Sequence, residues 1–111
     1  MKLFGKIALW MCDVEPGPRK PVSEIDLHDA FDAPGFSYGD DLFRLVADVL
    51  QSPSPGPLLG IVAERILLAR YRGRLAVGRL PAKRRMLVFF LMARGWLARR
   101  SLLIFHGELL C

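Results

Sequence analysis

The sequence predicts a small, mainly α-helical protein, and three observations support this fold class. Apolar residues make up 52% of the 111-residue chain, which is enough for one small core and argues against wholesale disorder. In the clearest segment, these residues recur at helical spacing. Residues that begin helices precede the apolar runs, and prolines and glycines separate one run from the next.

The first segment, residues 2–12, is the exception to this pattern. It is short and apolar without a clear helical period, and its aromatic and branched side chains favour a short β-strand over a free helix. Those side chains are Phe4, Ile7, Leu9 and Trp10. Residues 13–21 contain three prolines and one glycine, so we expect a loop there.

A short helix is predicted over residues 24–31. Ser23 supplies the side-chain oxygen of a helix N-cap, and Glu24 and Asp26 complement the positive end of the helix. The Ala-Pro-Gly sequence at 33–35 ends this helix. The residues that we expect to be buried are Ile25, Leu27, Ala30 and Phe31.

The clearest helix begins at Asp40 or Asp41 and ends near Gln51. Its apolar residues recur at positions i, i+3, i+4, i+7 and i+8, so they form one stripe that faces a core. This stripe consists of Leu42, Leu45, Val46, Val49 and Leu50. Residues 52–57, with the sequence Ser-Pro-Ser-Pro-Gly-Pro, then interrupt the helical pattern.

Two further helices are predicted after this break. The first covers residues 58–72 and has a broad apolar face. Residues 72–80 contain two glycines and form a loop or a frayed extension. Pro81 fits the first position of the second helix, where its missing amide costs nothing, and that helix runs to about residue 98. Residues 101–105 form either a short buried strand or more helix, because periodicity alone does not decide between them.

The charge of the chain is divided into two blocks. Residues 1–57 carry nine acids and five bases, a net charge of −4, whereas residues 58–111 carry eleven bases and two acids, a net charge of +9. We therefore predict an acidic helical half (1–51), a hinge (52–57) and a basic, apolar helical half (58–111). If the acidic half folds against the basic one, the two charges neutralise each other in part.

Basic residues between 65 and 85 are the candidate functional site. Guanidinium groups donate paired hydrogen bonds to phosphate, and Tyr71 offers a ring on which a base can stack. We therefore predict association with nucleic acid, or with a nucleic-acid-bound protein, and the basic run at 83–85 also matches a minimal nuclear import signal. The alternative is a solvated face, or arginines that pair with the acidic half. The candidate residues are Arg70, Arg72, Arg74, Lys83, Arg84 and Arg85.

The apolar segment from Met86 to Phe105 supports a different function. Its aromatic side chains suit a membrane surface or a partner protein, and Arg94, Arg99 and Arg100 would meet anionic headgroups. These arginines make a spanning helix improbable, because each costs ~2.5–3.5 kcal/mol near the centre of a bilayer. Binding to a membrane surface or a partner is thus the alternative function.

No catalytic arrangement is evident in the sequence, and we expect a non-enzyme without a cofactor or metal. Asp26 and Asp29 share a helix face beside His28, but such acids most often serve helix starts and turns. Cys12 and His28 are not surrounded by the motif of a nucleophile and its base, and no glycine-rich phosphate loop occurs. Two cysteines without a framework are expected to be reduced thiols in an intracellular protein.

The first half resembles the adenoviral U-exon proteins over roughly residues 1–50. The residues that carry the resemblance are Trp10, Lys20-Pro21-Val22, Leu27, Ala30-Phe31, Pro34, Phe36, Tyr38 and Leu42-Phe43. This resemblance implies a small basic viral accessory protein in the nucleus of the host cell. It further implies association with viral DNA replication compartments and no catalytic activity.

Overall fold

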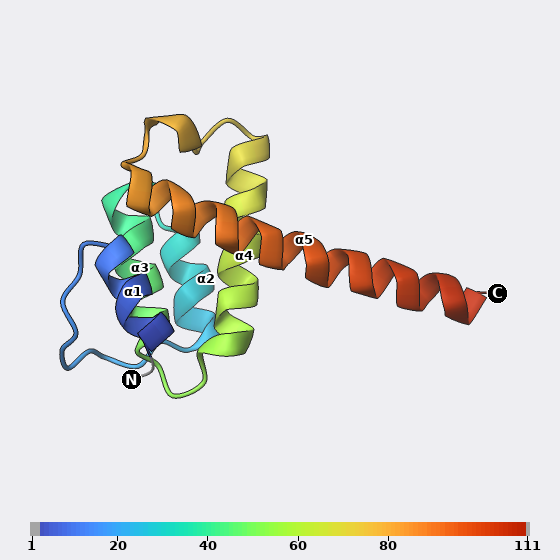
Figure 1. Ribbon diagram of the computed structural model, residues 1–111, viewed down its shortest axis with the longest axis horizontal. Helices are drawn as coiled ribbons and strands as arrows, with labels where there is room; N and C mark the ends of the chain where they lie inside the picture. The colour runs from blue at the N-terminus through green and yellow to red at the C-terminus, as the bar shows by residue number, and fades with distance from the viewer. Residues whose placement is uncertain (1–2, 111) are drawn as a thin grey trace.

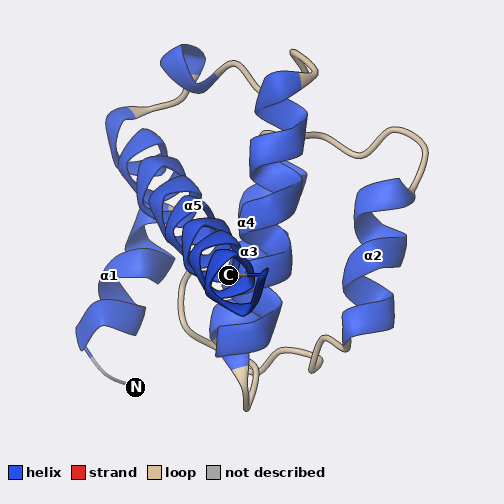
Figure 2. Ribbon diagram, turned by 90° about the vertical axis from the view of Figure 1, so that its right-hand side faces the viewer, coloured by secondary structure: helices blue, strands red, loops and turns tan. Residues whose placement is uncertain are grey.

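The computed structural model describes residues 3–110, and it confirms the mainly α-helical fold class. The helices are α1 (Leu3–Met11), α2 (Glu24–Asp32), α3 (Asp40–Leu50), α4 (Pro55–Tyr71) and α5 (Ala82–Leu110), with a short 3₁₀ helix η1 (Val77–Arg79) before α5. Helix α5 crosses the others, and its C-terminal part extends away from them (Figure 1). Figure 2 shows α1 and α2 on opposite sides of α3 and α4.

The predicted strand at residues 2–12 is wrong, because α1 is a helix. Ala8 and Leu9 of α1 are buried, and so is Cys12, which directly follows the helix and whose amide donates to the Ala8 carbonyl (3.1 Å). The opposite side of α1 is also apolar, and Trp10 there is 62% exposed. A helix that is apolar on both faces has no clear period in its sequence, which explains the error.

Helices α2 and α3 lie where the sequence predicts them. Ser23 caps α2: the amide of Asp26 donates to the Ser23 Oγ (3.1 Å), and the Ser23 amide donates to an Asp26 carboxylate oxygen (3.3 Å). Leu27 and Phe31 are buried, whereas Ile25 is 73% exposed, contrary to the expectation that it is buried. In the α3 stripe Leu42, Leu45, Val46 and Val49 are buried and Leu50 is half-buried.

The second half differs from the prediction at helix boundaries. Helix α4 begins at Pro55, earlier than the predicted residue 58, because proline is tolerated in the first turn of a helix. Pro81 precedes α5 rather than opening it, and its carbonyl accepts a hydrogen bond from the Arg85 amide (2.9 Å). The backbone of α5 stays helical past residue 98, so residues 101–105 are helix and not strand.

The acidic and basic halves share one core. Leu9 of α1, Phe43 of α3, Ile66 of α4 and Val88 of α5 belong to the same buried cluster. Helices α4 and α5 pack against each other more extensively than any other pair of helices in the described structure. A Cβ atom on Gly95 would lie 3.1 Å from the Cβ of α4's Ala63, so this glycine permits the contact between the two helices.

Among the described residues 3–110, no helix has the length and apolar character that crossing a bilayer requires.

Candidate nucleic-acid interface

The turn after α4 presents three arginines to solvent. Helix α4 ends at Tyr71, and Gly73 adopts a left-handed backbone conformation with φ of 73°. The Arg74 amide donates to the Ala69 carbonyl (2.8 Å) and the Gly73 amide donates to the Arg70 carbonyl (3.1 Å), which together form a Schellman motif. The backbone at Arg72 and Arg74 is therefore fixed by hydrogen bonds, although the side chains are exposed.

Residues 70–74, which we name the arginine turn, combine positive charge with an exposed ring. Arg70, Arg72 and Arg74 are all exposed, and within the described part of the chain none of them takes part in an ion pair. Tyr71 is 90% exposed. Cations at a helix C-terminus also stabilise the helix, by ~0.3–1 kcal/mol each, through their interaction with the helix dipole. That role does not require three arginines and an exposed tyrosine.

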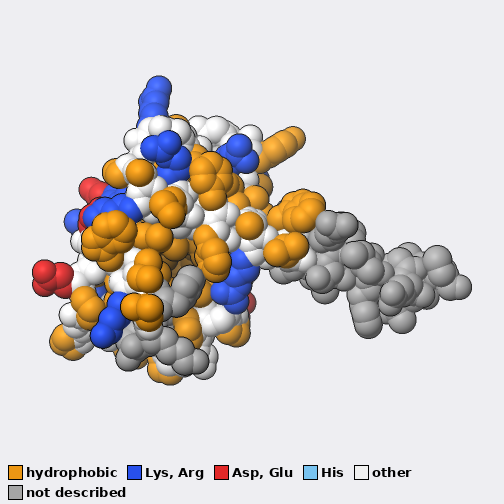
Figure 3. Space-filling model, in the orientation of Figure 1, with side chains coloured by type: hydrophobic (Ala, Val, Ile, Leu, Met, Phe, Trp, Pro, Cys, Tyr) orange, Lys and Arg blue, Asp and Glu red, His pale blue; other side chains and the backbone are white. Residues whose placement is uncertain are grey.

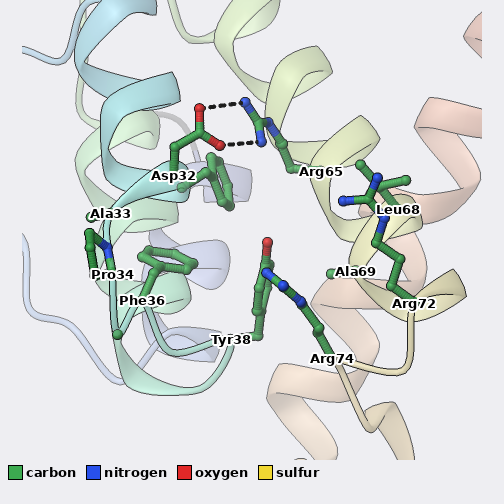
Figure 4. A pocket seen from close by; sticks show the side chains of 12 residues that line it. Asp32, Ala33, Pro34, Phe36, Tyr38, Arg65, Leu68, Ala69, Arg72 and Arg74 are labelled. Atoms are coloured by element: carbon green, nitrogen blue, oxygen red, sulfur yellow. Dashed lines mark hydrogen bonds and ion pairs between the residues drawn. The ribbon is translucent and has the colours of Figure 1, made fainter.

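A pocket of about 380 Å³ separates the arginine turn from the connection between α2 and α3. Figure 4 shows Phe36 on the side of the α2–α3 connection, Arg72 and Arg74 on the side of α4, and the Tyr38 ring between Phe36 and these arginines. The rings form a cluster over buried Phe31: the centroids of Phe36 and Tyr38 are 5.2 Å apart and nearly perpendicular, at 85°. We name this cavity the aromatic pocket.

Arg65 holds α2 against α4 at one end of the aromatic pocket. Its guanidinium donates to both carboxylate oxygens of Asp32, at 2.8 and 3.4 Å, and lies over the Phe31 ring. It also lies 2.9 Å from Nδ1 of His28, and because a guanidinium only donates, the histidine nitrogen is the acceptor of this hydrogen bond. Because Asp32 offsets the charge of Arg65, the excess positive charge at the pocket comes from Arg72 and Arg74.

The predicted basic residues 83–85 lie in a different environment. Lys83 pairs with Asp13, and Arg84 donates to both Asp13 (3.1 Å) and Asp40 (2.9 Å). Arg84 is also stacked over the Phe43 ring, with its guanidinium carbon 4.8 Å from the centroid. The Arg85 Nη2 donates to the Leu80 carbonyl (3.3 Å).

The six predicted site residues thus form two groups rather than one. Arg70, Arg72 and Arg74 lie at the C-terminal end of α4, whereas Lys83, Arg84 and Arg85 lie at the N-terminal end of α5, across the connection that carries η1 (Figures 1 and 2). The alternative of pairing with the acidic half holds for Lys83 and Arg84. The arginine turn keeps its exposed charge.

Sequence reasoning did not find the aromatic pocket. The rings Phe36 and Tyr38 follow the Pro34-Gly35 turn, and an aromatic pair beside such a turn is a weak indication of a loop that lines a site. Nothing in the sequence places this pair opposite Arg72 and Arg74, because that juxtaposition depends on how α2 packs against α4.

The structure also places the residues considered for catalysis. The Cys12 thiol is buried, and this burial raises its pKa to about 12, so it is protonated at neutral pH and is not a thiolate nucleophile. His28 lies beside Arg65 on the surface of α2. Among the residues that the structure describes, no group of three His, Cys, Asp or Glu side chains is arranged to hold a metal ion.

No protein-family model, characterised protein or solved structure matches this chain. The resemblance to adenoviral U-exon proteins therefore stays a prediction from the sequence. Four of the residues that carry it line the aromatic pocket: Phe31, Pro34, Phe36 and Tyr38.

Proposed function

We propose that this protein is a non-enzymatic accessory protein that binds nucleic acid through the arginine turn. The observation that supports this function best is the fixed turn with three exposed arginines, for which no ion pair is found in the described structure. Lys83 and Arg84 form ion pairs with acidic residues of the first half, so among the six candidate residues the arginines of the turn are the more available to a polyanion. The resemblance to U-exon proteins adds the nucleus of the host cell as the expected location.

The chemistry favours binding to single strands with little sequence preference. Phosphate contacts supply affinity by counterion release, which carries no sequence information. The exposed Tyr71 ring offers a stacking surface, and every unpaired base presents a face that can stack on it. In a duplex those faces are already stacked on each other, so Tyr71 would gain no such contact.

The test is the affinity for a fluorescently labelled oligo(dT) of roughly 20 nucleotides, longer than the site size of a small binding domain. Fluorescence anisotropy is measured over a salt series for the wild type and for Arg70→Gln/Arg72→Gln/Arg74→Gln. With three phosphate contacts removed, the affinity is expected to fall roughly 10- to 100-fold at about 0.1 M salt. The slope of log K against log salt should fall by about 2.

The matched control is Lys6→Gln/Lys20→Gln/Arg44→Gln. It removes the same net charge from three exposed residues on other parts of the molecule. We expect the control to keep most of the affinity. Absence of binding by the wild type, or an equal loss in both triple variants, would overturn the proposal.

Location is tested with a tagged chain in infected cells. The wild type is expected in the nucleus, and the variant of the arginine turn should enter it but lose its association with replication compartments. A wild type that stays outside the nucleus would contradict this part of the proposal. Changing residues 83–85 is a poorer test, because Lys83 and Arg84 form ion pairs that hold α5 to the first half.

A second candidate function is binding to a partner protein or a membrane surface through α5. Five large apolar side chains on its described part are about half exposed, from 49% to 61%: Met86, Phe89, Phe90, Trp96 and Leu97. Apolar side chains gather over this face of the molecule in Figure 3. Phe105, which also belongs to this hypothesis, lies outside the side chains that the structure describes.

The second candidate predicts that Trp96 fluorescence shifts to the blue with anionic vesicles, after Trp10 is replaced by phenylalanine to isolate the emission. An unchanged spectrum excludes the membrane version. If the ligand is a partner protein, the exposed apolar residues of α5 should become protected from solvent when that protein is added.

A further inference from the structure

We propose that the aromatic pocket binds one nucleotide unit, with its base against Phe36 and Tyr38 and its phosphate on Arg72 and Arg74. The unit is either part of a bound strand or a free mononucleotide, since the recognition chemistry is the same. Where the unit is part of a bound strand, this inference rests on the proposed function. It then assigns one nucleotide of that strand to a defined binding site beside the arginine turn.

The size and the shape of the pocket fit a ligand of this class. Its volume of about 380 Å³ lies at the small end of the ~300–1,000 Å³ range of small-molecule sites. A single base with its sugar is of this scale, and a duplex is not. Two chain segments that are distant in sequence, the α2–α3 connection and the end of α4, form its opposite walls (Figure 4).

Phe36 and Tyr38 supply the stacking wall. Both rings are half-buried, so each is held by packing and still exposes part of its surface, whereas Phe31 is buried beneath them. Within the described structure, no hydrogen bond to the Tyr38 hydroxyl is found, which leaves a polar group available to a ligand at the pocket. Stacking of one base on such rings contributes ~1–3 kcal/mol.

The charges at the pocket orient the ligand. Asp32 and Arg65 form a bidentate pair at one end, and the exposed Asp32 carboxylate repels a phosphate there. Arg72 and Arg74 lie on the wall opposite the rings, where no acidic side chain lines the cavity. The phosphate is therefore placed with Arg72 and Arg74, and the base lies against the rings of Phe36 and Tyr38.

The test uses the full chain with two probes, oligo(dT) and dTMP. Oligo(dT) binding is followed by anisotropy, and dTMP binding by the backbone amide resonances of Phe36, Tyr38 and Arg74. Phe36→Leu/Tyr38→Leu removes the stacking rings and keeps apolar volume and charge. It should lose roughly 5- to 100-fold in affinity for both probes without a change in the salt slope. Thymidine, which lacks the phosphate, should bind at least about tenfold more weakly than dTMP.

Tyr71→Leu is the matched control for dTMP, because it removes an exposed ring that lies outside this pocket. It should leave the affinity for dTMP unchanged and lower only the affinity for oligo(dT), since Tyr71 is a stacking surface for a strand in the proposed function. If the leucine variant of the pocket fails to fold, Arg72→Gln/Arg74→Gln is the second variant. Its substitutions lie on exposed side chains, and it should weaken dTMP binding by at least about tenfold.

The outcomes separate this inference from the proposed function. Binding of dTMP without oligo(dT) supports the pocket with a free nucleotide as its ligand, and it refutes the proposed function. Tight oligo(dT) binding that is unaffected in the leucine variant, with dTMP leaving the three amides unshifted, keeps the proposed function and overturns the pocket. Absence of binding by both probes overturns both.

Discussion

The contacts of Arg84 indicate that it stabilises the fold and does not contact a ligand. Replacing it with alanine tests this role. The Arg84 side chain is only 14% exposed and bridges Asp13 and Asp40, which belong to different parts of the acidic half. Its guanidinium also stacks on Phe43 in the core. All these interactions join the start of α5 to α1 and α3.

The expected loss of stability follows from these contacts. The carboxylate partners are 42% and 74% exposed, so each ion pair contributes only ~0.5–1 kcal/mol. The stacking on Phe43 adds ~0.5–1 kcal/mol, and the packed methylene stem adds ~1 kcal/mol more. Arg84→Ala should therefore lower the free energy of unfolding by about 3 kcal/mol. At a typical m-value of ~1.5 kcal/mol/M, the urea midpoint falls by about 2 M.

The assay is urea unfolding followed by far-UV circular dichroism, with two comparison variants. Arg84→Met keeps most of the stem, so it should recover about 1 kcal/mol of the loss. Arg70→Ala removes an equal charge from an exposed side chain and should change stability by less than ~1 kcal/mol. Equal urea midpoints for Arg84→Ala and Arg70→Ala would refute the reasoning. Arg84 would then again be a candidate residue for contact with nucleic acid.

Three further predictions concern packing, the buried thiol and pH. Gly60→Ala should raise the free energy of unfolding by ~1 kcal/mol, because a Cβ there meets no atom within 4 Å. Gly95→Ala should lack this gain, because its Cβ would lie 3.1 Å from α4. Equal gains in urea unfolding would contradict the close approach of α4 and α5. Cys12 should react with an alkylating reagent only when the chain unfolds, because it is buried and its pKa is about 12. The other cysteine is changed to serine for this assay. Rapid labelling of the native chain would show the prediction to be wrong. The pKa of Asp13 is lowered, chiefly by its hydrogen bond from Lys83. The contribution of the ionised Asp13 to the free energy of unfolding is therefore present at neutral pH and is lost as the pH falls through the lowered pKa. Wild type and Asp13→Asn should therefore differ in urea midpoint at neutral pH and converge in acid, and a constant difference would argue against this linkage.

Local patterns predicted much of the fold. Ser23 and Asp26 are adjacent enough in sequence to form the capping box by themselves, and the stripe of α3 has one apolar face because only one face meets the core. The pattern failed at α1, where the exposed Trp10 and the buried Leu9 put large apolar side chains on different faces of the helix. It also failed at Ile25, which is exposed although it is apolar.

The sequence by itself determined the helical elements after α1, the separation of charge along the chain and the presence of arginines that can bind phosphate. These properties depend on residue type and short-range spacing. The tertiary structure decided which of the basic residues are available. Packing brings Asp13 and Asp40 to Arg84 and leaves Arg72 and Arg74 facing an aromatic wall, because both results depend on contacts between residues that are distant in sequence.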